Sequence, residues 1–336
     1  GAPFLPCRSR ISRSTTGSIL GFSVAASLAA PDFRATRWNY SKTADSTAHR
    51  KALHGANGSI SDSGQPLFSA DEAPDTAMDK TELNRVIDHV ANAIDNAHVD
   101  QQPFFHLELK NVFPPDTYAR MMELMPVADD YRAMSGRTKS TRTMNGGGTR
   151  VKIDLFPEYI RHLPQEKREL WNLVGKALCS NKGRDAFLLK LAPGLQRRHG
   201  ENYDRIGMYP IPILTRDIPG YKIGVHPDTH WKGMTIQLYL PRDESINHVG
   251  TVFNAKNDDN SYRKAAQMSF SPNTGYAFAV DKDTYHSVET VGPEVKTRDS
   301  ILLTYFVDKT PLQVFRNRGK RFGNFVLNEV RSVARQ

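Results

Sequence analysis

The sequence predicts an α+β domain in which helices come first and brace a sheet of short strands. Two observations predict this fold class. Apolar residues recur with helical spacing between about residues 78 and 186, and short alternating segments follow from about residue 187 to residue 308. Helices that precede strands in this order usually pack on one sheet. Short strands separated by turns favour a sandwich or a barrel.

The composition is that of a globular protein rather than of a membrane or disulfide-rich one. Hydrophobic residues make up 39% of the 336 residues, and charged residues make up 24%. The sequence contains no apolar run of about 18 residues, so we expect no membrane span. The two cysteines, Cys7 and Cys179, exclude a disulfide framework and a cysteine-rich zinc site.

Residues 1–77 differ in composition from the rest of the chain. They are rich in Ala and Ser and lack hydrophobic periodicity, which predicts disorder. Three arginines precede the apolar stretch Ile19–Ala30, an order that is also typical of secretory and transit peptides. We therefore expect a disordered extension before Met78 or a targeting segment. The first alternative implies the cytoplasm, and the second implies an organelle or secretion.

The N-terminal part of the domain is expected to be mainly helical. An apolar stripe predicts a helix from Thr81 to about Asn96, and alternation predicts a strand at Phe104–Val112. Further helices are expected at Thr117–Leu124 and Gln165–Ser180. The polar, glycine-rich stretch Asp129–Arg150 between them is expected to be a surface loop or a lid over an active site.

Short strands are expected in the C-terminal half of the domain. Each candidate combines apolar alternation with a turn signal at its end. These segments are Tyr221–Val225, Met234–Leu240, Met268–Phe270, Gly275–Val280 and Ser300–Val307.

The first of these strands leads into a pair of metal-ligand side chains. His226 and Asp228 are two residues apart on extended chain, so their side chains point to the same side. His286, which follows another predicted strand and a turn, is the best candidate for a second imidazole. Two imidazoles and one carboxylate on one face of a metal ion are typical of non-haem Fe(II) oxygenases.

An arginine follows this constellation at the start of a buried strand. Arg298 comes twelve residues after His286, immediately before the apolar run Ile301–Val307. A buried guanidinium is costly unless an anion meets it, and a bidentate pair with a carboxylate would meet that cost. The pattern therefore predicts an anionic partner deep in the domain.

These stretches resemble the Fe(II)- and 2-oxoglutarate-dependent dioxygenases, especially the prolyl-hydroxylase-like branch. The resemblance covers about a third of the chain and implies a double-stranded β-helix, which is a jelly-roll or cupin-like barrel with iron at one mouth. It further implies that Arg298 binds the distal carboxylate of 2-oxoglutarate, assisted by Tyr239 and Ser300. The resembling segments are Val225–Asp228, Thr235–Pro241, Gly250–Phe253, Gly275–Phe278, Tyr285–Val288 and Thr297–Phe306.

The resemblance also implies a reaction. Fe(II), 2-oxoglutarate and O2 would together hydroxylate a C–H bond with release of succinate and CO2. Related halogenases carry Gly or Ala at the position of Asp228, so its retention implies hydroxylation rather than halogenation. The most similar branch acts on peptidyl proline, and a peptidyl hydroxylase is therefore one alternative. A catalytically inactive interaction module is another.

Basic residues near the expected mouth favour a small, anionic or amino-acid-like substrate. The candidate substrate-contacting residues are Tyr209 and Arg216, upstream of the metal motif, and Arg142 and Arg150, in the possible lid. A formal net charge of +9 and a pI near 9.4 suit an anionic partner. The sequence carries no signal for an oligomeric state.

The C-terminal segment allows two interpretations. Residues 309–328 combine basic and aromatic side chains and contain no acidic residue, as in nucleic-acid-binding modules. Apolar residues with helical spacing over about residues 320–334 instead indicate a helix that docks on the barrel. Docking is the simpler interpretation, and we do not expect nucleic acid as the main partner.

Overall fold

The computed structural model describes residues 75–134 and 148–307. The predicted extension before residue 75, the substrate candidate Arg142 and the predicted C-terminal helix at 320–334 lie outside these residues. The first helix begins at Asp75, three residues before the boundary expected from composition.

Five α-helices precede the main strands in the described part of the chain. Their N-termini use the expected local chemistry, such as Pro115 in the first turn of the second helix and the Ser180 hydroxyl that accepts from the Gly183 amide. No helix in the described ranges is long and apolar enough to cross a membrane. The helices are α1 (Asp75–Asp95), α2 (Pro115–Glu123), α3 (Gln165–Leu178), α4 (Asn181–Lys190) and α5 (Ala192–His199).

The strands form two antiparallel sheets. The large sheet has the order β1-β2-β10-β7-β12-β5-β4-β3, and the small sheet has the order β6-β11-β8-β9. The strands of the large sheet are β1 (His98–Asp100), β2 (His106–Lys110), β3 (Arg132–Ala133), β4 (Arg150–Asp154), β5 (Met208–Asp217), β7 (Lys232–Tyr239), β10 (Thr274–Ala279) and β12 (Arg298–Val307). Those of the small sheet are β6 (Ile223–His226), β8 (Val252–Lys256), β9 (Tyr262–Gln267) and β11 (His286–Val288).

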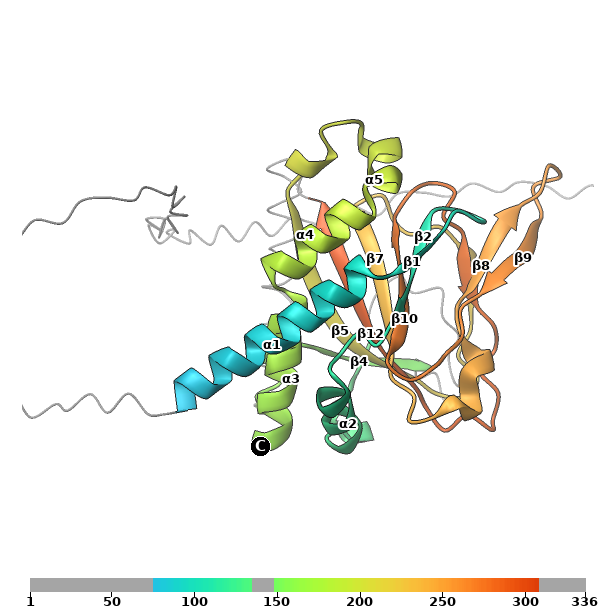
Figure 1. Ribbon diagram of the computed structural model, residues 1–336. Helices are drawn as coiled ribbons and strands as arrows, with labels where there is room; N and C mark the ends of the chain where they lie inside the picture. Colours follow the sequence, from blue (N-terminus) through green and yellow to red (C-terminus); the bar gives the residue numbers. More distant parts are fainter. Residues whose placement is uncertain (1–74, 135–147, 308–336) are drawn as a thin grey trace, which may run out of the picture. The chain divides into compact units, whose positions relative to one another are not determined.

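The two faces of the large sheet differ in chemistry. Ile236 and Leu238 of β7 and Ile301 and Leu303 of β12 belong to one apolar core with the helices. Figure 1 shows α1, α3 and α4 on one side of the large sheet and β8 and β9 on the other. The alternate residues of the same strands face the small sheet, because side chains alternate along a strand. We call this second face the inner face.

Aromatic residues fill the space between the two sheets. Tyr276 and Phe278 of β10 pack edge-to-face with Phe253 of β8, at ring-centroid distances of 5.1 and 6.0 Å. Phe104 joins the same cluster at 4.7 Å from Phe253. This second core lies between the two sheets, on the side of the large sheet that faces away from the helices.

The structure extends the helical part of the chain beyond the expected boundary. Helices α4 and α5 continue to His199, so residue 187 lies within a helix and the first long strand begins only at Met208. Pro193 and Gly194 look like helix breakers in the sequence, but the proline stands in the first turn of α5, where no amide donor is required.

Strand β5 was not expected from the sequence because it contains Pro210 and Pro212. Proline cannot donate to a strand ladder and is confined to edges and bulges. Both prolines precede the residues of β5 that pair with β4, and the Pro212 carbonyl accepts from the Leu155 amide beyond the end of that strand. The expected strand at Met268–Phe270 is also displaced, because β9 ends at Gln267.

Candidate metal centre

Three ligand-type side chains converge at one end of the small sheet. His226 ends β6, Asp228 follows it in the connection to β7, and His286 begins β11. Antiparallel pairing places His226 opposite His286, with their ring centroids 4.5 Å apart. One ligand atom from each of the three side chains lies within 4.8 Å of the other two. In the described residues, this is the group of His, Cys, Asp or Glu side chains that could hold a metal ion.

Main-chain carbonyls orient both imidazoles. Nδ1 of His226 lies 2.8 Å from the Gly224 carbonyl oxygen, and Nδ1 of His286 lies 3.1 Å from that of Thr284. When Nδ1 carries the proton and donates to the carbonyl, Nε2 is the atom with a lone pair for a metal. Burial lowers the pKa of His286 to about 4, so this imidazole is neutral near pH 7, as a ligand must be.

The Asp228 carboxylate is held by two neighbours. The Lys232 ammonium donates to Oδ1 and the Thr235 hydroxyl donates to Oδ2, both at 2.6 Å. Burial opposes ionisation, but the charge of Lys232 and the two hydrogen bonds hold the pKa of Asp228 well below its usual range. The carboxylate is therefore ionised and fixed in orientation.

A row of buried polar groups runs from Thr235 along the inner face. Gln237 donates from Nε2 to the Ser300 hydroxyl at 2.7 Å, and this hydroxyl also lies 2.9 Å from that of Thr215. The Tyr276 hydroxyl lies 3.5 Å from Gln237 Oε1 and 3.2 Å from the Thr251 hydroxyl. Polar side chains in a buried strand are costly unless they are paired. These hydrogen bonds therefore let the interior between the two sheets hold polar groups.

Arg298 stands at the far end of this row and is fully buried. Its guanidinium donates to the Val249 carbonyl at 2.7 Å and to Asp217 Oδ2 at 2.8 Å, and Nη2 lies 3.5 Å from the Thr251 hydroxyl. The Phe270 ring covers it, with its centroid 4.8 Å from Cζ.

The Asp217 carboxylate serves two cations. Arg150 donates to it from Nε at 2.5 Å and from Nη2 at 2.8 Å, while Arg298 approaches from the other side. Two guanidinium charges and one carboxylate leave a net charge of +1 in this buried triad. A second carboxylate would neutralise it, and the low local polarity strengthens that attraction.

Of the two expected helpers of Arg298, Tyr239 lies next to its guanidinium, and Ser300 is on the same strand. The Tyr239 ring centroid lies 5.7 Å from Arg298 Cζ, and its hydroxyl accepts from the Thr251 amide at 3.0 Å. Ser300 lies two residues further along β12, and its hydroxyl already contacts Gln237 and Thr215. Both residues belong to the inner face, and a direct contact with a co-substrate stays a prediction.

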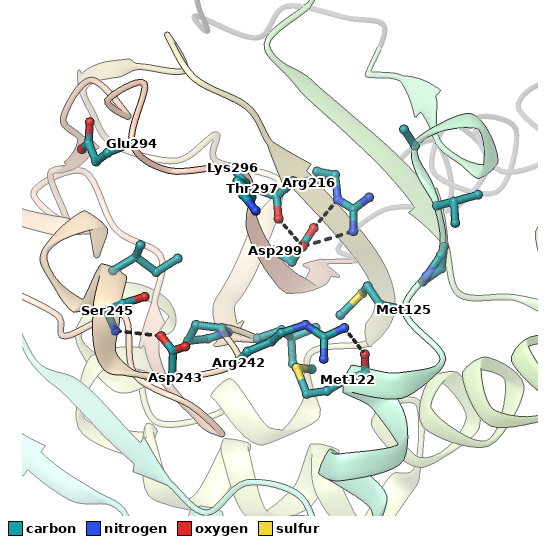
Figure 2. Close-up of a pocket in the computed structure, with 16 residues that line it drawn as sticks. Met122, Met125, Arg216, Arg242, Asp243, Ser245, Glu294, Lys296, Thr297 and Asp299 are labelled. Carbon is teal, nitrogen blue, oxygen red and sulfur yellow. Dashed lines mark hydrogen bonds and ion pairs between the residues drawn. The ribbon is translucent and has the colours of Figure 1, made fainter.

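Arg216 lies on the helix-facing side of β5, opposite to Asp217. Its guanidinium donates to both oxygens of Asp299, at 2.6 and 3.2 Å, and stacks 4.5 Å from the Tyr131 ring. Figure 2 shows this pair in a pocket between the end of α2, the segment after β7 and the start of β12. The volume of the pocket is about 750 Å³. The metal ligands adjoin the opposite end of β7, so the pocket and the candidate metal centre are separate places.

The other described substrate candidates lie on the inner face. Tyr209 stacks on Phe306 at 5.7 Å, and Phe306 is paired with Lys232, the residue that holds Asp228. Tyr209 therefore lies at the end of the sheet that carries the metal ligands. Arg150 is instead engaged with Asp217 and covers the Tyr221 ring at 4.3 Å.

Several residues of the site were not predicted from the sequence. Asp217 and Lys232 lie outside every predicted motif, and Thr235 and Thr251 lie in resembling segments but were given no role. Lys232 and Thr235 lie four and seven residues after Asp228, and this closeness is the one sequence signal that could have found them. The pairing of Asp217 with Arg298 joins residues that are 81 positions apart.

Comparisons with known proteins find likeness only among solved structures. No protein-family profile matches the sequence, and no curated protein matches it. A prolyl-4-hydroxylase from Pseudomonas putida is 13% identical, with a TM-score of 0.39, and the match covers 65% of this chain and 98% of the other.

Two further structures have a similar degree of likeness. A 2OG-Fe(II) oxygenase family oxidoreductase from Burkholderia pseudomallei is 14% identical, with a TM-score of 0.37 and coverage of 71% and 93%. A Trichoplax adhaerens prolyl hydroxylase, in complex with a hypoxia inducible factor peptide fragment, is 10% identical, with a TM-score of 0.38 and coverage of 70% and 94%. The chain is thus similar, at low identity, to solved structures that include prolyl hydroxylases and a 2OG-Fe(II) oxygenase.

Proposed function

We propose that the chain is an Fe(II)- and 2-oxoglutarate-dependent hydroxylase, with iron held by His226, Asp228 and His286. The observation that carries this proposal is the layout of the inner face. Two imidazoles of the small sheet and the Asp228 carboxylate converge beside one end of this face, and a guanidinium cluster with surplus positive charge stands at the other end. In this proposal the two antiparallel sheets are the two walls of a double-stranded β-helix.

The residues fit the groups that they would hold. Two imidazoles and one ionised carboxylate suit Fe(II) and leave open positions on the ion. The triad of Arg150, Asp217 and Arg298 suits the distal carboxylate of a dicarboxylic acid, because one of its two cations has no carboxylate of its own. When bound, Fe(II) and 2-oxoglutarate supply the oxidation of a C–H bond by O2, with release of succinate and CO2.

The protein's own contribution is position and exclusion of water. Thr235 and Lys232 fix the Asp228 carboxylate, and the Phe278 ring packs against His286 at a centroid distance of 5.2 Å. Aromatic walls of this kind keep bulk water away from a reactive centre. A small, anionic or amino-acid-like substrate would enter near Tyr209, at the metal end of the inner face.

The test is a turnover assay on the full-length chain. Anaerobic addition of Fe(II) and 2-oxoglutarate should give a visible charge-transfer band, and admission of O2 should convert 2-oxoglutarate to succinate. His226→Ala should abolish both signals, and Arg298→Gln should weaken 2-oxoglutarate binding while the protein still binds metal.

The matched control is His230→Ala, because His230 is an exposed histidine only two residues from Asp228. This variant should keep the charge-transfer band and the turnover. A folded wild-type protein that binds neither Fe(II) nor 2-oxoglutarate would contradict the proposal. Once turnover is established, free amino acids and proline-containing peptides can be compared as substrates by the extra succinate that each produces.

A further inference from the structure

Arg198 of α5 binds main chain on both sides of the candidate metal centre. Its guanidinium donates to the carbonyl oxygens of His230, of Lys232 at 2.5 Å, and of Val280. All three acceptors are backbone carbonyls, so the contact is not an ion pair with a carboxylate. It joins two segments that are distant in sequence.

Each of these segments leads to a metal-ligand residue. His230 and Lys232 follow Asp228 in the connection from β6 to β7, and the Lys232 ammonium also holds the Asp228 carboxylate. Val280 follows β10 and begins the turn that ends at His286. The Val280 amide donates to the Gly233 carbonyl at 2.9 Å, so the two segments also touch directly.

The neighbouring arginine of α5 contacts the same turn from outside. Arg197 donates to Asp281 at 3.1 Å and to Asp283 at 2.8 Å. Its side chain is 47% exposed, and solvent weakens such ion pairs. Arg198 is the more buried of the two, and its planar fork fixes donor directions that a lysine ammonium cannot reproduce.

We propose that Arg198 is a positioning residue for the metal centre. By joining the segment after Asp228 to the segment before His286, it holds these two ligands at a separation suited to one ion before the ion arrives. This inference rests on the proposed function. A helix that fixes ligand-bearing loops in advance raises metal affinity, because the loops need not be ordered on binding.

The test compares metal binding with apo-protein stability in the full-length chain. Metal-free protein is titrated anaerobically with Co(II), whose visible absorption reports both affinity and coordination geometry. Arg198→Gln should weaken Co(II) binding about tenfold, as is typical for residues that orient metal ligands, and should alter the absorption spectrum. Arg198→Lys should fall between this variant and the wild type.

Arg184→Gln is the matched control. Arg184 lies on α4 and pairs with its neighbour Asp185, away from both ligand-bearing segments, so its loss should leave Co(II) affinity and spectrum unchanged. Wild-type affinity and spectrum in Arg198→Gln would overturn the proposal, even if the variant melts at a lower temperature.

Two further outcomes decide the remaining cases. If Arg198→Gln does not fold, wild-type affinity and spectrum in Arg198→Lys overturn the proposal, and weaker binding with an altered spectrum supports it. If the wild-type protein binds no Co(II), the proposed metal centre itself fails, and the inference fails with it. If the wild-type protein binds Co(II) and the Arg198 variants bind it equally well and with the same spectrum, the inference about Arg198 fails but the proposed function stands.

Discussion

At the scale of single residues, the candidate site differs from the rest of the described chain mainly in its buried charged side chains. Arg298 and Asp217 are both fully buried, in a region where Coulomb interactions are strong and unpaired charge is costly. Asp217 is therefore the residue on which two guanidinium groups depend. This dependence can be measured without any ligand.

Asp217→Asn should lower the free energy of unfolding of the metal-free protein by about 3–5 kcal/mol, because two buried cations lose their carboxylate. Urea denaturation measures the change. Asp88→Asn serves as control, since it removes an ion pair with Lys182 whose side chains are 60% and 59% exposed. That variant should change stability by at most about 1 kcal/mol, and equal losses in both variants would contradict this interpretation of the triad.

His286 should give the metal-free protein a characteristic pH dependence. Its pKa is lowered to about 4 by burial, against about 6.5 in an unfolded chain. Between these values the unfolded state binds more protons, so stability falls as the pH drops through this window, by about 3 kcal/mol from this group. The pKa of Asp228 is lowered too, and its effect appears only below about pH 4.

The measurement is urea unfolding at several pH values, with EDTA present, for the wild type and His286→Gln. The variant should lose most of the slope between about pH 6.5 and pH 4. If the two slopes coincide, the histidine is not held neutral by burial.

At the level of elements, the close approach of α3 to the main chain beside the large sheet limits which residues the helix can carry there. Helix α3 crosses the main chain near Leu155 at Gly175, where an added Cβ would lie 2.3 Å from the Leu155 carbonyl oxygen. Glycine is a poor helix former, so its place in the middle of α3 reflects this approach and not helix propensity.

Gly175→Ala should therefore destabilise the protein by up to about 2 kcal/mol. The gain in helix propensity is about 1 kcal/mol, but pushing α3 away from main chain costs more, as overpacking does. Thermal unfolding measures the balance. Gly183→Ala on α4 is the control, since its nearest neighbour would be the Ser180 hydroxyl at 3.2 Å, and this variant should be neutral or stabilising.

The elements that sequence patterns predicted are those with strong local periodicity. The mixed helix and antiparallel-sheet fold was predicted, and so were α2, α3, β7, β10 and β12 within a few residues. Helix α1 was predicted too, but it begins at Asp75, six residues before the expected start at Thr81. Helix α5 and strand β5 were missed because each contains proline, which is an ambiguous signal in a sequence. A proline can end an element, or it can stand where no amide donor is needed.

At the scale of the whole molecule, the candidate metal centre joins the two sheets. His226 and His286 belong to the small sheet, whereas Asp228 is bonded to Thr235 of the large one. A metal ion bound by all three residues would therefore bridge elements that otherwise meet through the aromatic cluster around Phe253.

Addition of metal should stabilise the whole domain and not only a loop. At a metal concentration about 100 times Kd, the expected gain is about 2.7 kcal/mol, measured as a rise in melting temperature with Mn(II) in place of Fe(II). Hydrogen exchange of β7 and β11 should slow together. His226→Ala should show neither effect, and protection confined to the segment between β6 and β7 would contradict a bridging ion.

The same scale explains which parts of the site could be predicted. His226 and Asp228 share a short motif, and extended chain places them on the same side. The partners of Arg298 cannot be read locally, because Asp217 and Thr251 reach it through strand register and loop packing. Local alternation was enough to pair His226 with Asp228, and the strand and turn before His286 and the strand after Arg298 indicated those two residues. Asp217, which only long-range register brings to Arg298, was not predicted.

The alternation along β7 and β12 has one more consequence. The strands that supply apolar residues to the helix-side core supply Thr235, Gln237 and Arg298 to the inner face. A slip of a single residue between these strands would send every one of those side chains to the wrong side. A chain that misaligns them would lose its core and its candidate chemistry in the same step, so any selection for correct folding also preserves the geometry of the site.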